Sequence, residues 1–308
     1  NSGFDCGHPP RLVELYACSG CTVEGLVLRN PPYWTFHIVY SDNITVKDVK
    51  VLAPTDSPNT DAVDIDSSTD VEIDGLYCYN GDDCIAVKSG KGPRGVATAL
   101  PSRNIHARRI SSNGVAGIAL GSEMSGGLQN VTIEDVVLTG SMGIDIKGGL
   151  GRGGFIKDVV FRNFSHTFGF TRCDPSLPCE GIRPSDYQSG SEGWIQLEPN
   201  GDMCQDDCPD NCPHNCTSEW APQVHNIRFE RIHATGNRGI PTGKLQCRPE
   251  SPCTGITMSD IRFPRNHGGG FDCNGHVQGT AAGVDVGAVA FEKERPISAL
   301  CRGGRDST

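Results

Sequence analysis

Long hydrophobic runs are missing from this chain of 308 residues. No stretch approaches about 18 consecutive apolar residues, so no transmembrane helix is predicted. Leucine is scarce, with 15 leucines against 42 valines plus isoleucines, and this ratio favours strands because β-branched residues suit a pleated surface. Basic residues are outnumbered, 27 against 37 acidic ones, and a formal charge of −10 argues against nucleic-acid binding, which needs a basic surface.

Cysteine, by contrast, is abundant. Fifteen cysteines are more than a reducing cytosol normally holds outside metal sites. Four N-glycosylation sequons are also typical of a secreted chain. They begin at Asn43, Asn130, Asn163 and Asn215. We therefore expect a secreted protein, extracellular or associated with a cell wall. Because the chain begins at Asn1 without a signal peptide, we also expect a processed product that lacks an upstream part.

The cysteine spacing predicts disulfides. Three pairs have five residues between them, a loop that can bring two Cα atoms within bonding range: Cys78 and Cys84, Cys173 and Cys179, Cys247 and Cys253. Four more cysteines follow at four-residue intervals, at Cys204, Cys208, Cys212 and Cys216. On a helix these four would form a zinc site, but the prolines among them argue against a helix and favour disulfides. The odd total leaves one thiol over, for which Cys6 is the candidate.

A four-residue pattern of an apolar residue, any residue, a turn-forming or charged residue and a second apolar residue recurs along the chain. It appears at 23–26, 46–49, 73–76, 107–110, 133–136, 156–159, 229–232 and 258–261. The spacing is 23 to 34 residues except for one gap of 73, which must hide a further repeat. Periods in the twenties with alternating β-branched residues predict an all-β fold, a β-solenoid. Leucine-rich repeats would need more leucine, and an irregular β-sandwich remains the alternative.

A second strand in each coil is marked by alternating apolar pairs, such as Val63 with Ile65 and Ile85 with Val87. If these apolar residues point inward, the residues between them point outward. Two positions before each pair stand Asp61 and Asp83, which should then lie on neighbouring coils about 4.8 Å apart. Asp82 precedes Asp83 and can reach the same groove. Further along, the outward positions hold Lys88, Asp145 and Lys147.

Three carboxylates at one place in a solenoid suit hydrolysis of a glycosidic bond. That reaction needs a protonated carboxyl group for the leaving oxygen and a carboxylate to activate water. Neighbouring carboxylates raise one another's pKa, so one can stay protonated while another is ionised. The alternative is that these aspartates only form Asx turns at the corners of the coils.

The blocks Asn59-Thr60-Asp61, Gly81-Asp82-Asp83-Cys84 and 144–147 resemble the signature of the polygalacturonases, glycoside hydrolase family 28. The sequence around these blocks is most similar to the plant-type, exo-acting branch, and the resemblance runs from about residue 11 to residue 301. It implies a right-handed parallel β-helix and inverting hydrolysis without a cofactor or metal. For inversion the carboxyl groups of Asp82 and Asp61 should lie about 6.5–9.5 Å apart.

Carried over to this sequence, the resemblance makes Asp82 the general acid, and Asp61 and Asp83 the pair that activates water. Lys147 matches the lysine that binds the sugar carboxylate. Lys88 and Arg152 are expected as further substrate contacts, and Asp145 as a substrate-facing residue.

This sequence departs from the family pattern at two positions. Ala116 stands where the family has histidine, and Asp145 stands where it has arginine. Because Asp145 would repel a sugar carboxylate, we expect it to pair with Lys147 or Arg152 and to favour an uncharged or esterified sugar. A shifted coil, with Arg152 in place of the missing arginine, is the other reading.

Together these observations predict one parallel β-helix domain over 1–308, short of some N-terminal coils, with a Cys-rich insertion at about 173–216 that can wall off one end of the groove. The expected function is a glycosidase acting on a pectin-like polysaccharide, as a monomer that binds neither nucleic acid nor membrane. Two alternatives stay open: another β-helix enzyme such as a lyase or epimerase, and a non-catalytic glycoprotein.

Overall fold

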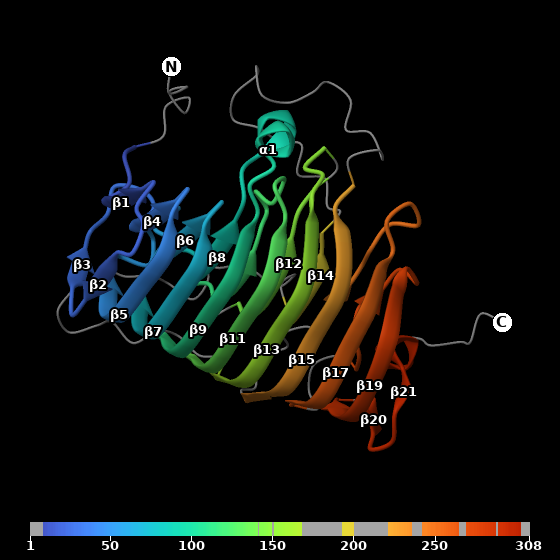
Figure 1. Ribbon diagram of the computed structural model, residues 1–308. Coiled ribbons are helices and arrows are strands. Elements are labelled where there is room, and N and C mark those ends of the chain that lie inside the picture. Colours follow the sequence, from blue (N-terminus) through green and yellow to red (C-terminus); the bar gives the residue numbers. More distant parts are fainter. Residues whose placement is uncertain are drawn as a thin grey trace.

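The computed structural model describes residues 9–140, 142–149, 151–167, 193–199, 221–235, 242–264, 269–287 and 289–302. Within them the chain winds into a stack of coils, and the order of the coils follows the order of the sequence from the blue to the red end (Figure 1). Each coil adds one strand to each of two sheets, and the strands of successive coils pair in parallel, with antiparallel pairing at the C-terminal end of the second sheet. The predicted solenoid is therefore a parallel β-helix.

The first sheet carries short strands. Its nine strands, among the described residues, are in order β1 (Val13–Tyr16), β4 (Phe36–Val39), β6 (Val63–Asp66), β8 (Ile85–Lys88), β10 (Ile118–Leu120), β12 (Ile144–Lys147), β14 (Ile195–Glu198), β16 (Gly243–Leu245) and β18 (Asp272–Cys273). The register pairs Val63 with Ile85, Ile85 with Ile118, and Ile118 with Ile144. These are the inward columns that the alternation predicted.

The second sheet carries the long strands in the foreground of Figure 1. It runs through β2 (Thr22–Glu24), β5 (Asp42–Leu52), β7 (Thr69–Tyr79), β9 (Ser102–Ser112), β11 (Leu128–Leu138), β13 (Phe155–Thr167), β15 (Gln223–Thr235), β17 (Cys253–Phe263), β19 (Val277–Val286) and β20 (Ala290–Phe291). Beside this path, β3 (Val27–Arg29) pairs with β5 and β21 (Arg295–Pro296) with β19. Two helical segments complete the described elements, α1 (Gly92–Thr98) and a 3₁₀ turn η2 (Ile297–Leu300).

The recurring four-residue pattern bends each long strand. Its third residue takes a left-handed backbone conformation, as at Asp48, Gly75, Arg109 and Asp135, where φ is +48°, +86°, +55° and +56°. Apart from Leu26 in the first repeat, which is exposed, the two apolar residues on either side of the bend point into the core; Val46 and Val49, for example, are buried. Gly, Asn and Asp adopt this conformation more readily than other residues, which explains why turn-forming residues stand at most of these positions, although Arg109 and Arg231 adopt it as well.

Most long strands have a second residue with a left-handed backbone nearer their start, as at Asp70, Asn104 and Asn130. Side-chain amides link these residues from one coil to the next. Asn104 donates to Asp70 at 2.8 Å, and Asn130 donates to Asn104 at 2.9 Å. At the bends described above, Asn163 donates to Asp135 at 2.9 Å. The sequon residues Asn43, Asn130 and Asn163 thus occupy exposed bends of the long sheet, and Asn215 lies outside the described residues.

Four disulfides close loops within the described part of the chain. Cys78–Cys84 and Cys247–Cys253 confirm the predicted pairs. Cys18–Cys21 and Cys273–Cys301 are additional. The predicted Cys173–Cys179 bond, the cysteines from 204 to 216 and Cys6 lie outside the described residues.

The gap of 73 residues holds no further coil, because β13 pairs directly with β15. Within the stretch 173–216 the described residues add only β14, the short strand between these two long strands, just as β12 lies between β11 and β13. The prediction of a hidden repeat was therefore wrong. No helix in the described ranges is long and apolar enough to cross a membrane.

Candidate active site

The three aspartates singled out by the sequence meet at the beginning of β6 and β8. The register of these strands places Asp61 and Asp83 at equivalent positions, and the Ala62 N–H donates to the Asp83 carbonyl at 2.9 Å. One carboxylate oxygen each from Asp61, Asp82 and Asp83 can be chosen so that all three lie within 4.8 Å of one another. The predicted convergence of the three carboxyl groups is therefore present.

Hydrogen bonds from the Asn80 side chain hold the corner that carries Asp82 and Asp83. This buried amide donates to the carbonyl oxygens of Thr60 at 2.9 Å, Asp82 at 2.8 Å and Asp83 at 3.0 Å. The next residue is Gly81, where a Cβ would lie 2.1 Å from a backbone oxygen of the preceding coil. The corner therefore accepts no larger residue, and the buried Cys78–Cys84 disulfide closes its loop.

The carboxyl groups of Asp61 and Asp82 differ in their surroundings. Asp82 accepts N–H bonds from Asn59 at 3.1 Å and from Asp83 at 2.8 Å. Asp61 is 3% exposed, and its Oδ1 has no hydrogen-bond partner among the described residues. Burial raises the pKa of Asp61 well above its usual value, with the charges of Asp64 and Asp82 adding to it. Burial and the charge of Asp83 also raise the pKa of Asp82, so the cluster retains a proton at pH values where isolated aspartates are ionised.

Lys147 reaches the same cluster from β12. Its Nζ lies 3.0 Å from Asp83 Oδ2 and 3.7 Å from Asp145 Oδ2. Although burial opposes it, the charges of Asp83 and Asp145 raise the pKa of Lys147 above its usual value, so Lys147 carries a positive charge between two carboxylates. The expected pairing of Asp145 with Lys147 is therefore present.

Lys88 occupies a different place from the one expected. Its side chain is 6% exposed, with Nζ 3.0 Å from Glu123, 3.6 Å from Asp64 and 3.9 Å from Asp61. The ammonium also lies 4.5 Å from the ring centroid of Trp34. A lysine this deeply buried offers a substrate almost no surface, which corrects the expectation that Lys88 is a substrate contact.

Arg152 is also buried, in the turn after β12. It acts electrostatically on Glu123: although burial opposes it, Lys88 and Arg152 lower the pKa of Glu123 to about 2. Glu123 is thus an ionised carboxylate between two cations. Glu123 is not among the residues predicted from the sequence, because its contact depends on the path of a loop.

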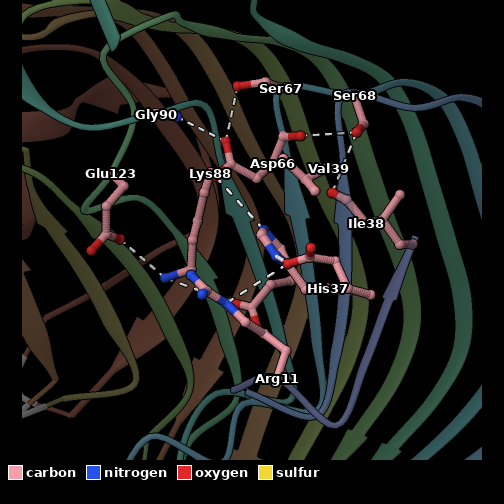
Figure 2. Close-up of polar contacts among 12 residues, drawn as sticks. Arg11, His37, Ile38, Val39, Asp66, Ser67, Ser68, Lys88, Gly90 and Glu123 are labelled. Carbon is pink, nitrogen blue, oxygen red and sulfur yellow. Dashed lines mark hydrogen bonds and ion pairs between the residues drawn. The ribbon is translucent and has the colours of Figure 1, made fainter. Parts of the chain in front are cut away.

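Asp64 and His37 are further members of this buried region. Asp64 is fully buried, and neither of its carboxylate oxygens has a hydrogen-bond partner among the described residues. Burial raises the pKa of Asp64 to about 7, against the opposing charges of Lys88 and His37. On β4, His37 Nδ1 lies 2.9 Å from Glu14, and its other ring nitrogen lies 3.8 Å from Asp66. Figure 2 shows His37 and Asp66 beside the Lys88–Glu123 pair.

Ala116 lies in the column of Asp61 and Asp83, as the register of β8 with β10 requires. It is 5% exposed and contributes only a methyl group. The positive charge near the cluster therefore comes from lysines on β8 and β12.

The separation of the carboxyl groups is shorter than expected. The chosen oxygens of Asp82 and Asp61 lie within 4.8 Å, not in the range of about 6.5–9.5 Å that applies to an acid and a base facing each other across a scissile bond. Neighbouring coils impose this spacing, because parallel strands lie about 4.8 Å apart. A separation near 5 Å is the one that applies to a retaining pair, so this spacing counts against Asp82 and Asp61 as the opposed acid and base of an inverting reaction.

Comparison with known proteins places the site in a family. The model of the family described as glycosyl hydrolases family 28 matches residues 1–167, just over half of the chain. A probable polygalacturonase from Vitis vinifera is 45% identical over 159 residues, which are 51% of this chain and 32% of that protein. A polygalacturonase from Prunus persica is 26% identical over 291 residues, 92% of this chain and 63% of that protein. The chain thus spans less than two thirds of either relative.

Solved structures agree on the fold. A hyperthermoactive exopolygalacturonase from Thermotoga maritima superposes with a TM-score of 0.70 at 21% identity, over 94% of this chain and 57% of that chain. An endo-xylogalacturonan hydrolase from Aspergillus tubingensis gives 0.55 at 18% identity, over 89% of this chain and 68% of that chain. These likenesses confirm the predicted right-handed parallel β-helix.

The matched segment contains both blocks that build the carboxylate corner, together with Lys147 of β12. With more than half of its length matched by the family model, and with that corner assembled on adjacent rungs, this chain belongs to family 28 of the glycosyl hydrolases.

Proposed function

We propose that this protein hydrolyses glycosidic bonds in a pectin-like polysaccharide. The observation that carries the proposal is the cluster of Asp61, Asp82 and Asp83, whose oxygens lie within 4.8 Å and which retains a proton. Hydrolysis requires a proton for the leaving oxygen and a carboxylate for water within one site. Family membership adds that related chains carry the name polygalacturonase.

Within this proposal Asp82 is the general acid. It is the most exposed of the three, since Asp61 and Asp83 are 3% and 2% exposed, so it is the one best placed to reach a leaving oxygen. Asp83 lies 3.0 Å from Lys147 and, with Asp61, accepts the hydrogens of the attacking water. The reaction uses no metal or cofactor in this account.

The charge of the pocket bears on the substrate. Lys147 is shared between Asp83 and Asp145, and its positive charge is therefore largely neutralised before any sugar binds. A free galacturonate carboxylate placed there would face Asp145, and like charges about 4 Å apart repel each other by roughly 4 kcal/mol at an effective dielectric near 20. We propose that an esterified or uncharged sugar is preferred at this position.

The disulfides and sequons support secretion, to the extracellular space or a cell wall, and we propose that the enzyme works there as a monomer. A lyase or epimerase is the second candidate, but no observation among the described residues favours it over hydrolysis. A non-catalytic glycoprotein is the third.

The test is a reducing-sugar assay on polygalacturonate, methyl-esterified pectin and neutral wall polysaccharides, with the product followed by NMR and by absorbance at the wavelength of unsaturated sugars. Hydrolysis predicts new reducing ends without unsaturation, and inversion predicts that the first product has the opposite anomeric configuration. An unsaturated product would establish a lyase. Absence of turnover on every polysaccharide would favour the non-catalytic protein.

A further inference from the structure

Lys88 connects residues from four consecutive coils. It leaves the end of β8 on the outward face of the short-stranded sheet and turns back along that sheet. Its Nζ lies near Asp61 and Asp64 of the preceding coil and within 4.5 Å of the Trp34 ring centroid one coil earlier still. On the opposite side it is 3.0 Å from Glu123, which belongs to the following coil. Figure 2 shows Lys88 extended toward Glu123 in this position.

Burying the charge of Lys88 costs desolvation free energy. A lysine that is 6% exposed loses most of its hydration, and a well-packed apolar residue would often stabilise the fold equally well. The chain instead keeps one cation against three carboxylates, two of which, Asp61 and Asp64, are themselves buried. Because only 6% of the Lys88 side chain is exposed, its charge acts on the neighbouring side chains.

We propose that Lys88 is a positioning residue that opposes protonation of Asp61 and thereby shifts the proton of the cluster toward Asp82. This inference rests on the hydrolysis proposed above. The geometry is asymmetric in the required sense: Lys88 approaches Asp61, whereas Asp82 stands at the exposed corner. Without a nearby cation, Asp61 would be the best proton acceptor of the three, because it is buried and its Oδ1 receives no hydrogen bond from the described residues.

Other charges face the same groups and set how strongly Lys88 acts. The charges that act on Asp61 are those of Asp64, Asp82, Asp83 and Lys88. Lys88 interacts with the charges of Asp61, Asp64, Asp83 and Glu123. The charges of His37, Lys88, Asp83 and Glu123 act on Asp64, and those of Asp83, Lys88 and Lys147 act on Asp82. The charge of Lys88 lowers the pKa of Asp61, against burial and the surrounding carboxylates. Glu123 competes for that charge at the shorter distance of 3.0 Å.

The two sides of Lys88 give variants of opposite sign. In Lys88→Met the pKa of Asp61 rises, because an opposite charge within about 4–6 Å typically lowers a carboxyl pKa by one unit or more. The acidic limb of the pH profile of kcat/KM, which reports ionisation of Asp61 in the free enzyme, should therefore move up by about one pH unit. In the Glu123→Gln variant, Lys88 interacts with one carboxylate fewer and therefore acts more strongly on Asp61. The acidic limb should then move to lower pH. Lys88→Arg keeps the charge and should leave the limb near its original position.

Lys244→Met is the matched control. Lys244 is also an ion-paired lysine of the short-stranded sheet, 2.9 Å from Glu198, but it lies on β16, away from the cluster. Its removal should leave the acidic limb where it is. If Lys88 served only to hold the coils together, Lys88→Met would reduce the rate equally at every pH, and that result would overturn the proposal. So would an equal limb shift in Lys244→Met.

A second measurement is independent of turnover. Carbon-13 NMR titration of labelled aspartate carboxyl groups, with Asp61→Asn used to assign the signal of Asp61, should show the Asp61 titration moving up in Lys88→Met and down in Glu123→Gln. If Lys88→Met does not fold, Glu123→Gln alone decides by the sign of its shift. If the natural protein cleaves none of the polysaccharides but the titration shifts as stated, the proposed function fails while the action of Lys88 on Asp61 stands.

Discussion

Lys147 Nζ lies 3.0 Å from Asp83 Oδ2, although 64 residues separate the two in the chain. The contact exists because β8, β10 and β12 stack in register, which brings residues of three coils to one face. One consequence is that the charge of the site is decided by rungs that are distant in sequence. A substitution on β12 therefore acts directly on a carboxylate at β8.

Asp82→Asn tests the general acid. The amide cannot supply a proton and hardly changes the volume, so we expect the rate to fall by about 10²–10⁴-fold with the melting temperature unchanged. Activity above half of the natural rate would remove Asp82 from the mechanism. Reducing-end release and a thermal melt on the same preparation provide the measurement.

Asp61→Asn and Asp83→Asn should each be severe, because both groups act on the same water. Combined, they should cost much less than the product of the single losses, since residues that act as a unit are strongly non-additive. Simple multiplication of the two effects would mean that the two aspartates serve separate steps.

Asp145→Arg tests the substrate preference. The natural protein should cleave methyl-esterified polygalacturonate faster than the free acid, because Asp145 and Asp83 already engage Lys147. The substitution removes the repelling carboxylate and adds a cation, so the ratio of rates should move toward the free acid. A natural preference for the free acid that Asp145→Arg does not increase would show that Asp145 does not face the sugar.

Asp64 should make the fold less stable as the pH rises. Its pKa is raised from 3.8 to about 7 in the folded protein, so below pH 4 the stabilisation of the protonated form is complete, and it is lost as the pH rises through about 7. The melting temperature of the natural protein should therefore fall between pH 4 and 7. Asp64→Asn, which cannot ionise, should show a smaller fall over the same range; an identical fall would contradict the assignment.

The two disulfides of equal loop length provide another comparison. Cys78–Cys84 and Cys247–Cys253 both join residues six apart, so replacing either pair by alanines should cost about 2 kcal/mol of stability. Only the first pair borders the carboxylate corner. We expect turnover at a temperature where both variants are folded to fall in Cys78→Ala/Cys84→Ala and to stay near the natural value in Cys247→Ala/Cys253→Ala.

The fold and the aspartate corner could be predicted from sequence because both follow from the two-residue alternation of the short strands and from the recurring pattern of the long ones. Alternation in strands such as 63–66 and 85–88 determines which side chains leave the core, and stacking then aligns Asp61 with Asp83. The pairing of Asp145 with Lys147 follows equally, since both residues leave one short strand on the same side.

The position of Lys88 could not be predicted in this way. Alternation indicates that its side chain leaves the sheet outward, but not where a long, flexible side chain ends. It is buried because Trp34 and Glu123 cover it, and each comes from a different coil. The expected separation of about 6.5–9.5 Å was wrong because the two acids lie on adjacent rungs, whose spacing brings them closer together.

The left-handed bends of the long strands have a consequence for how such proteins can diversify. Neighbouring bends stay in contact whether 28 residues separate them, as between Asp135 and Asn163, or 68, as between Asn163 and Arg231. Extra residues are therefore accommodated between rungs without shifting the strands. The connections between rungs can therefore lengthen or shorten while the register of the strands, and with it the carboxylate corner, is kept, so the surroundings of the corner can change without rebuilding it.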